Sequence, residues 1–381
     1  MVKSKGKNLH DAKKAKNDEF YTMWRDIENE MNAYRDYDEN VFRDKVVLLP
    51  CDDPEWSNFT RYFAHNFELF GIKKLISTSY AQASNPAIDE HEPSNMEVES
   101  DKYDPDKSWE RGKIFVLERG DDRNGDGRVN FHDMQWSYLD GDGDFRSDEV
   151  TALRDEADIV VTNPPFSLYR DFVNWLVDGD VLFSIIGNTN SVTYKEIFPL
   201  IKDNEMWVGA NSKGGSRRGN SLLFTVPDDV EVKNAVEYDG HQCTQVSAWW
   251  FTNIEHGRRH EHLELLSMAD NLKYSRRKKI REEGYPEYDN YDAIEVGFTE
   301  AIPKDYDGVM GVPISFLSKY NPDQFEIVGM AKRGAGDPAL KTRVYTKDDF
   351  SNYSDLNAGP TLWRGDVLRN TYPRVLIRQK N

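Results

Sequence analysis

One stretch of the sequence decides the fold, Asp158-Ile159-Val160-Val161-Thr162-Asn163-Pro164-Pro165-Phe166. Its first five residues form a short, mostly apolar run, which predicts a strand buried on both faces of a parallel sheet. The next four leave the strand at its carboxyl end, where doubly wound α/β sheets bind their ligands. The stretch therefore predicts an α/β fold with a candidate site at Asn163-Pro164-Pro165-Phe166.

Strands and helices alternate on both sides of this stretch. Towards the N-terminus, strands predicted at 46–49 and 74–78 enclose a helix over 59–70, which makes a βαβ unit. Helices are also expected over 20–34 and 169–177, and further strands over 113–118, 181–186, 221–226 and 247–252. The last two strands read as an antiparallel pair at the sheet edge. This alternation predicts a doubly wound, mostly parallel sheet of the Rossmann-like type.

The alternation fails beyond residue 257. The remaining sequence is rich in Gly, Pro, Tyr and basic residues, so a second, smaller domain is predicted over 257–381. The first domain, 1–256, begins with a basic arm over 1–19 and contains an acidic insertion over 119–140. Between the second and third strands, the polar segment 84–112 is expected to be loop.

Charge gives a mixed indication of the partner. The 381 residues contain 49 Lys and Arg against 67 Asp and Glu, a net charge of −18, which by itself argues against a nucleic-acid partner. Yet residues 257–281 hold eight bases and three acids. Those bases could neutralise phosphates or could simply be a solvated face, and they are Arg258, Arg259, Lys273, Arg276, Arg277, Lys278, Lys279 and Arg281.

The sequence indicates a soluble chain. No apolar run approaches the roughly 18 residues of a membrane span, and the start lacks the apolar segment of a signal peptide. A cytoplasmic location without membrane contact is therefore expected. Cys51 and Cys243 match neither a disulfide framework nor a zinc cluster, so both are interpreted as free thiols.

The residue types of Asn163-Pro164-Pro165-Phe166 suit the methylation of an exocyclic amine. Such an amine is a poor nucleophile because its lone pair is conjugated with the ring. If the Asn163 side-chain oxygen and the Pro164 carbonyl accept its two hydrogens, the nitrogen becomes more tetrahedral and its lone pair is exposed. The prolines would keep both oxygens in place, and Phe166 would stack on a flipped base. The alternative is an ordinary Asn-Pro turn.

A second motif occupies residues 122–133. It places oxygen donors at EF-hand positions 1, 3 and 5, glycine at position 6 and a carboxylate at position 12. Calcium is therefore a candidate structural ion, with a solvated acidic turn as the alternative. The expected ligands are Asp122, Asn124, Asp126, Asp133 and the backbone carbonyl of Arg128.

Five motifs together resemble a known family. They are residues 16–22, 50–57, 141–147 and 311–316, together with Asn163-Pro164-Pro165-Phe166. In this order they resemble the adenine-specific DNA methyltransferases of the EcoRI type, within the larger group of S-adenosylmethionine-dependent amino-methyltransferases. The resemblance covers most of the chain. It implies a methyltransferase fold whose C-terminal part recognises the DNA target.

The resemblance also implies a set of cofactor contacts. Tyr21 and Thr22 would contact the methionine end, and Asp52 and Asp53 would pair with its ammonium group. Asp144 would accept from the cofactor's adenine amine, while Phe145 packs on that ring. The loop after the first strand departs from the wider group because it lacks glycine; the contacts expected there come from Pro50, Asp52, Asp53 and Ser57. The acid usual at the end of the second strand is also missing from residues 77–80.

The predicted activity is transfer of a methyl group from S-adenosylmethionine to the 6-amino group of adenine in duplex DNA, with the base flipped out. A cognate restriction endonuclease is a further partner suggested by the resemblance. One alternative is methylation of another planar amide, such as protein glutamine, because the same acceptor geometry serves both. Another is a calcium-dependent binding module built on a methyltransferase scaffold.

Overall fold

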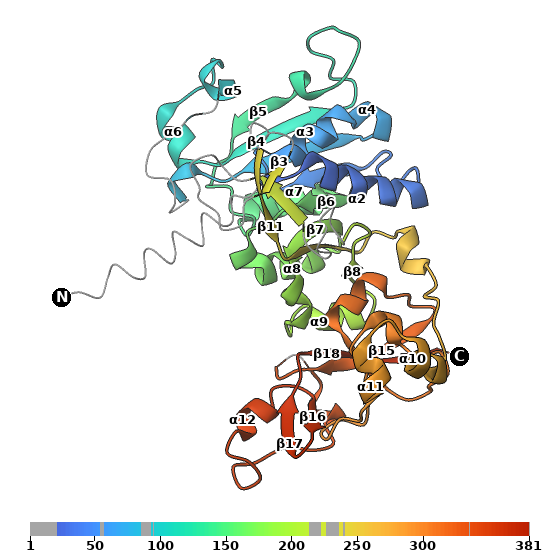
Figure 1. Cartoon of the computed structure of the whole chain (residues 1–381). Helices are drawn as coiled ribbons and strands as arrows, with labels where there is room; N and C mark the ends of the chain where they lie inside the picture. The colour runs from blue at the N-terminus through green and yellow to red at the C-terminus, as the bar shows by residue number, and fades with distance from the viewer. Residues whose placement is uncertain are drawn as a thin grey trace, which may run out of the picture. The chain divides into compact units, whose positions relative to one another are not determined.

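The computed structural model describes residues 21–53, 57–84, 93, 95–212, 222–225, 236–238, 241–334 and 336–380. They form two compact units. The first contains Met1–Thr189 and Gly209–His256, and the second contains Asn190–Val208 and Gly257–Asn381. In Figure 1 the chain runs from blue at its start to red at its end, so the orange and red elements all belong to the second unit.

A mixed sheet forms the centre of the first unit, with strand order β5-β4-β3-β2-β6-β7-β12. Its middle is parallel: β3 (Lys74–Ser79), β2 (Val46–Leu49), β6 (Ile159–Thr162) and β7 (Leu182–Asn188). Three antiparallel pairings extend it, through β4 (Lys113–Glu118), β5 (Gln135–Tyr138) and β12 (Ala248–Thr252). The register pairs Leu48 with Ile76 on one side and with Val160 on the other. The predicted α/β character is confirmed. The sheet is mixed rather than mostly parallel, because β4, β5 and β12 all pair in the antiparallel direction.

Helices pack on both faces of this sheet. Val47, Leu49 and Val161 belong to one buried cluster with side chains of α2 (Trp24–Tyr37), α3 (Asn58–His65) and α4 (Phe67–Phe70). Strand side chains alternate between faces, so the fully buried Leu48 and Val160 point the other way. On that side α7 (Asp148–Glu156) contacts β2 and α8 (Tyr169–Asp178) contacts β7.

Local signals explain where these helices begin and end. The Ser57 hydroxyl accepts from the backbone N–H of Phe59 and caps α3, as the Ser147 hydroxyl caps α7 through Val150. The predicted helix over 59–70 is broken at Asn66, which separates α3 from α4. Gly71 ends α4 with a φ of 65°, a left-handed conformation that glycine adopts without strain.

The predicted edge pair of strands is wrong. Strand β9 (Leu222–Thr225) lies in a separate four-stranded sheet of order β1-β9-β11-β10, whereas β12 pairs with β7 in the central sheet. The partners of β9 are β1 (Tyr21–Thr22) and β11 (His241–Val246), and β10 (Val236–Tyr238) pairs with β11. The polar sequence His241-Gln242-Cys243-Thr244-Gln245 lacks the apolar run used to find strands, so the true partner was missed.

The segment 84–112, expected to be loop, contains α5 (Asn95–Val98) and α6 (Pro105–Glu110). Both are too short to be stable without tertiary contacts. Glu97 of α5 is held by a buried ion pair with Lys113 of β4 at 2.6 Å, with side chains only 1% and 6% exposed. Asp104 caps α6, which has proline at its start. Contacts with distant residues therefore stabilise helices that the polar composition of this segment did not predict.

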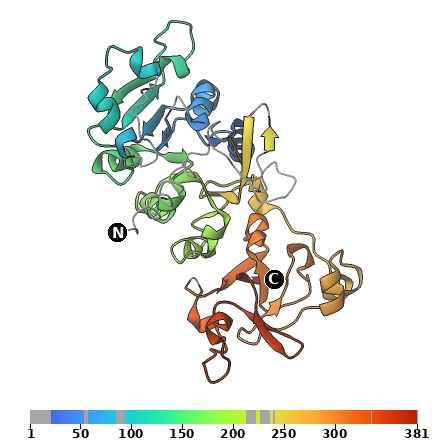
Figure 2. The ribbon, with the colours of Figure 1, turned by 60° about the vertical axis from the view of Figure 1, so that its left-hand side comes forward.

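The second unit has its own sheet, of order β13-β14-β18-β15 (Figure 2). Its strands are β13 (Ile294–Glu295), β14 (Met310–Pro313), β15 (Phe325–Ala331) and β18 (Arg374–Gln379). A hairpin joins β16 (Thr361–Arg364) to β17 (Val367–Asn370). The helices are α9 (Phe198–Lys202), α10 (Met268–Tyr274), α11 (Lys278–Glu283) and α12 (Tyr353–Leu356), and Trp207–Val208 forms β8.

Residues 190–208 cluster with this second unit, although the sequence placed them before the boundary at 256. The Lys332 amine donates to the hydroxyl of Thr193 at 2.6 Å, and α9 contacts β15. The Arg259 guanidinium lies 3.8 Å from the ring centroid of Trp207. Non-local contacts of this kind leave no local signal in the sequence. Throughout the described ranges, none of the helices is long and apolar enough to cross a membrane.

Candidate active site

The candidate site lies where the strand order of the first unit reverses. Strand β2 pairs with β3 on one side and with β6 on the other, and all three run parallel. The loops that follow β2 and β6 therefore leave the sheet at the same edge, which is the switch point where such folds bind ligands. One loop carries Asp52 and Asp53, and the other carries Asn163-Pro164-Pro165-Phe166.

Hydrogen bonds hold these two loops together. The Asp52 carboxyl group lies 2.6 Å from the hydroxyl of Ser57 and 2.5 Å from the hydroxyl of Thr162, the last residue of β6. The same Thr162 hydroxyl lies 2.6 Å from the carbonyl oxygen of Pro50. Burial raises the pKa of Asp52 to about 7, against the opposing effect of the Ser57 and Thr162 hydrogen bonds. Asp52 is thus a buried acid that joins the loop after β2 to the end of β6.

The Asn163-Pro164-Pro165-Phe166 loop is packed rather than exposed. Pro164 is buried, and Asn163 and Phe166 are half-buried, with the Phe166 ring against the main core cluster. The short 3₁₀ turn Phe166–Leu168 leads directly into α8. Strand, turn and helix therefore fix both ends of the loop, as a preorganised acceptor site requires.

The Tyr21-Thr22 segment also reaches this edge. Its two residues form β1, and the carbonyl oxygen of Thr22 accepts from the side-chain amide of Asn58, the first residue of α3. Thr22 is buried. Ser57 caps the same helix end while it donates to Asp52, so two motifs separated by some 30 residues meet here.

The loop over residues 141–145 packs against the end of β3. The backbone N–H of Ala81 donates to the carbonyl of Asp142, and that of Gly112 donates to Gly141. Gly143 has a φ of 83°, and a Cβ atom there would lie 2.4 Å from the carbonyl oxygen of Ser79. Only glycine fits this close approach. Asp144 is thereby brought near the loop after β2, where its charge acts on the Cys51 thiol.

Asp144 and Phe145 are engaged within the protein. A hydrogen bond from Arg146 lowers the pKa of Asp144, and the guanidinium lies 2.6 Å from one carboxylate oxygen. Phe145 is 2% exposed and packs edge-on against Phe172 and Trp175 of α8. Little of the Phe145 ring remains to cover a ligand, so its expected stacking on the cofactor stays a prediction.

The calcium interpretation of residues 122–133 has no support. Asp122 accepts from the backbone N–H groups of Gly125, Asp126 and Gly127, and the Asn124 side chain accepts from Asp126. No group of three or more His, Cys, Asp or Glu side chains in the described chain could hold a metal ion. The loop oxygens satisfy the loop's own backbone instead, the alternative expected of a solvated acidic turn.

The other expected calcium ligands, Asp133, Asp126 and Arg128, also make hydrogen bonds within the loop. Burial would raise the pKa of Asp133, but N–H donors of Asn130, Asn124 and Arg123 bring it below its usual value. Asp126 accepts from the N–H of Arg128. The spacing fits an EF-hand because a calcium-binding loop and a solvated acidic turn both need short, oxygen-bearing side chains around glycine.

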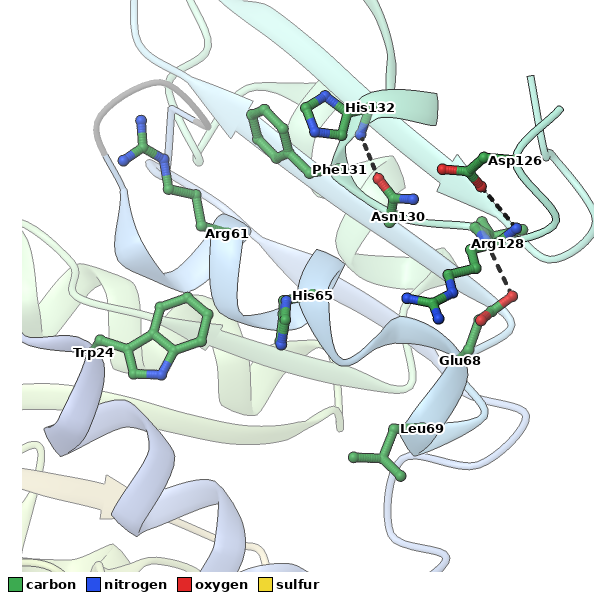
Figure 3. Close-up of a pocket in the computed structure, with 11 residues that line it drawn as sticks. Trp24, Arg61, His65, Glu68, Leu69, Asp126, Arg128, Asn130, Phe131 and His132 are labelled. Carbon is green, nitrogen blue, oxygen red and sulfur yellow. Dashed lines mark hydrogen bonds between the residues drawn. The ribbon is translucent and has the colours of Figure 1, made fainter. Parts of the chain in front are cut away.

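That loop forms one wall of a pocket of about 770 Å³ in the first unit, opposite α3 and α4 (Figure 3). The carboxylate of Glu68 accepts from the backbone N–H of Val129 and ties the loop to α4. Arg61, His65, Arg128 and His132 line the pocket together with Glu68 and Asp126, so charges of both signs meet there. Its lining includes none of the residues of the Asn163-Pro164-Pro165-Phe166 loop.

The basic residues after 257 differ in their availability. Arg259 is 8% exposed and donates to Asn204, so it is a structural residue of the second unit. Arg277 is paired with Glu300 at 2.6 Å and lies over the Phe298 ring, and Arg281 donates to the carbonyl of Ser275. Arg276 and Lys279 are exposed, and no ion pair within the described ranges involves either.

Sequence reasoning missed the residues that connect the loops. Thr60 and Ser77 donate to the backbone carbonyl of Asp52, and Thr162 contacts its carboxyl group. Thr60 lies within a helix, and Ser77 and Thr162 lie near strand ends, so all three resemble ordinary helix or strand positions. The one available signal was the place of Thr162, immediately before Asn163 at the end of a buried strand.

Comparison with known proteins identifies relatives of this chain. A family model described as "Adenine-specific methyltransferase EcoRI" matches residues 8–380. The chain is 42% identical over 330 residues to the type II methyltransferase M.EcoRI of Escherichia coli, covering 86% of this chain and 90% of that protein. It is 33% identical over 376 residues to the type II methyltransferase M.MpnI of Mycoplasma pneumoniae, covering 97% of each. No solved structure matches.

Proposed function

This chain belongs to the EcoRI family of adenine-specific methyltransferases, and we propose that it methylates the 6-amino group of adenine in duplex DNA at the switch point between β2 and β6. The observation that carries the placement is the position of Asn163-Pro164-Pro165-Phe166 directly after β6, beside the buried acid that follows β2. The relatives are named type II methyltransferases, which supports a role as the modification enzyme of a restriction-modification pair.

Asn163 and Pro164 would activate the amine without acting as a base. The side-chain oxygen of Asn163 and the carbonyl of Pro164 accept the two amine hydrogens, which directs the nitrogen lone pair towards the methyl donor. The half-buried Phe166 offers an apolar ring to the extruded base, and a flipped base needs such a stacking partner. Since the loop is fixed by β6 and α8, these groups need no reorganisation during the reaction.

The donor set at this edge fits S-adenosylmethionine, the methyl donor implied by the family. When bound, it supplies an electrophilic methyl group. Asp53 is half-buried and provides a carboxylate for the cofactor's ammonium, with Thr22, Pro50 and Ser57 around the same loop. Gly143 packs closely against the Ser79 carbonyl, and Asp144 and the exposed phenol of Tyr80 are the neighbouring residues. These two side chains suit the nucleoside end of the cofactor. Asp52 fits the ammonium poorly because hydroxyl groups already occupy its carboxyl oxygens.

The second unit would hold the target DNA. Its exposed Arg276 and Lys279 suit phosphate contacts, which position the duplex, whereas other side chains of the unit would read base edges. This division fits the strongly acidic net charge, because only a limited basic surface has to meet the DNA backbone.

The test is a methyl-transfer assay with tritiated S-adenosylmethionine and duplex DNA, followed by nucleoside analysis. We expect labelled N6-methyladenine from unmodified genomic DNA, and no label in DNA isolated from cells that express the protein. Label in cytosine, or in added protein rather than DNA, would contradict the proposal.

A further inference from the structure

Asp52 has hydrogen bonds that do not suit a free anionic ligand for the cofactor. Asp52 is 5% exposed, and its partner Thr162 is 0% exposed. Thr162 directly precedes Asn163 in the sequence. The backbone of Asp52 is fixed as well, because its N–H donates to Thr78 and its carbonyl accepts from Thr60 and Ser77. The side chain therefore has a single position, directed at the end of β6.

Counting protons shows which group donates in this cluster. The Thr162 hydroxyl has one hydrogen but lies 2.6 Å from the Pro50 carbonyl oxygen and 2.5 Å from the Asp52 carboxyl oxygen Oδ2. Both contacts can be full hydrogen bonds only if the Thr162 hydrogen goes to the Pro50 carbonyl, which can only accept. The contact between Thr162 and Asp52 is then a hydrogen bond only if the carboxyl group itself carries a proton and donates it.

The other Asp52 oxygen is already satisfied. The Ser57 hydroxyl donates to Oδ1 at 2.6 Å and in turn accepts from the N–H of Phe59. One proton on Asp52 thus gives each polar group a partner in the series of hydrogen bonds that runs from the Phe59 N–H through Ser57, Asp52 and Thr162 to the Pro50 carbonyl. An ionised Asp52 would leave two oxygens, of Thr162 and Pro50, in contact without a hydrogen between them, a costly arrangement where water is excluded.

We propose that Asp52 is a protonated positioning residue, which donates a hydrogen bond to Thr162 and thereby fixes the strand end that presents Asn163 and Pro164 to the target amine. This role rests on the proposed function. It replaces the expectation that Asp52 pairs with the cofactor's ammonium, and it leaves that pairing to Asp53.

The electrostatic surroundings agree with a neutral acid. Burial raises the pKa of Asp52 to about 7, and the neighbouring Asp53 contributes in the same direction. The other ionisable groups nearby are the Cys51 thiol on the same loop and Asp144. After burial, the charges of Asp52 and Asp144 raise the pKa of that thiol. Within the described residues no cation contributes to the shift of Asp52.

The test uses two matched pairs of variants in the full chain. Asp52→Ala and Thr162→Val remove the hydrogen bond, whereas Asp52→Asn and Thr162→Ser preserve a donor and an acceptor at the same places. An asparagine amide can donate to Thr162 and accept from Ser57, as the protonated acid does. Thermal melting of each variant confirms folding, and if Asp52→Ala does not fold, the Thr162 pair alone decides.

We expect Asp52→Ala and Thr162→Val to lower kcat by about tenfold or more, with the KM for S-adenosylmethionine changed by less than about threefold. Asp52→Asn and Thr162→Ser should restore most of the lost kcat. Wild-type kcat should decline as pH rises through about 7, where Asp52 loses its proton, and Asp52→Asn should lack that step. The proposal is overturned if Asp52→Asn raises the KM for the cofactor as much as Asp52→Ala, or if Thr162→Val has normal kcat.

A second measurement does not depend on activity. The ¹³Cγ chemical shift of Asp52, assigned with Asp52→Asn, reports its protonation directly. We expect a protonated carboxyl group at a pH of about 6, well above the ordinary aspartate value. An ionised Asp52 at that pH overturns the proposal, whereas a wild-type protein that methylates no adenine while Asp52 is protonated contradicts the proposed function alone.

Discussion

The carboxyl oxygen Oδ2 of Asp52 lies 2.5 Å from the hydroxyl oxygen of Thr162. These residues follow or end two different strands, β2 and β6, at the point where the strand order reverses. Because Asn163 is the next residue after Thr162, the contact couples the loop after β2, where we propose that the cofactor binds, to the loop that would receive the adenine. Placement of the acceptor oxygens is thereby tied to the core of the sheet.

Loss of the Asn163 amide should impair the chemical step. Asn163→Ala is expected to lower kcat by about 100-fold or more, since it removes one preorganised partner of the transition state. Binding of S-adenosylmethionine, measured by calorimetry, should remain close to that of the wild type. Near-normal turnover in Asn163→Ala would refute the role given to this residue, and Asn40→Ala, at an exposed turn after α2, is the control.

Phe166 should contribute to holding the extruded base. Phe166→Ala is expected to raise the KM for DNA and lower kcat, because base-aromatic stacking contributes about 1–3 kcal/mol. Phe166→Tyr keeps the ring and should retain most activity. Equal losses in both variants would show that packing of Phe166 against the core, rather than stacking on a base, is what matters.

Exposed bases of the second unit should contribute to DNA affinity through phosphates. Replacing Arg276 and Lys279 by glutamine should weaken binding to all sequences and reduce the slope of log K against log salt by up to about 2. Filter binding over a range of salt concentrations measures that slope. A changed sequence preference at an unchanged slope would mean that the two side chains read bases instead.

Arg277 supplies the matched control for that experiment. Its guanidinium is paired with Glu300, so Arg277→Gln should alter stability more than the salt slope. A slope change in Arg277→Gln as large as that of the Arg276 and Lys279 variant would contradict the distinction drawn from the ion pair.

Removal of a buried charge should stabilise the first unit. Burial raises the pKa of Asp26, in α2, to about 6, above the value of 3.8 expected when unfolded. Between these values the folded chain binds more protons than the unfolded chain, so stability falls as pH rises from about 4 to 6. Asp26→Asn should therefore raise the free energy of unfolding by about 1–3 kcal/mol more at pH 8 than at pH 4.

Urea denaturation at the two pH values measures this difference. Asp36→Asn, at an exposed position of the same helix, serves as the control. An equal change in unfolding free energy for Asp26→Asn at both pH values would show that Asp26 titrates normally in the folded protein.

Calcium removal should leave the protein unchanged. The oxygens of Asp122 and Asp133 accept from backbone N–H groups of their own loop, so no ion is required to hold it. Thermal melting in chelator and in millimolar calcium should give the same Tm. A Tm that rises with the logarithm of calcium concentration would restore the EF-hand interpretation.

Much of the central fold could be predicted because its signals are local. Strand β2 was predicted at its observed bounds from the apolar run Val46–Leu49, and Lys113–Glu118 likewise forms β4. The buried run that ends at Thr162 was also predicted, and it forms β6, which leads into the candidate site. Each of these segments is long enough and apolar enough to identify without knowing its partners.

What could not be predicted depends on contacts between distant residues. Strand β11 has a polar sequence and exists because it pairs with β9, and α5 is held by the ion pair between Glu97 and Lys113. The role that we propose for Asp52 depends on such contacts as well. An acid in the loop after β2 suggests a cofactor ligand, and only the positions of Ser57 and Thr162 show that its oxygens are already engaged.

The most direct test of the whole account is single-molecule sequencing of genomic DNA from a methylation-free host that expresses this chain. We predict N6-methyladenine at one defined sequence throughout the genome, and its absence in a matched culture that expresses Asn163→Ala. A genome without modified adenine in the presence of folded wild-type protein, or one that is modified equally by Asn163→Ala, would contradict the central claim.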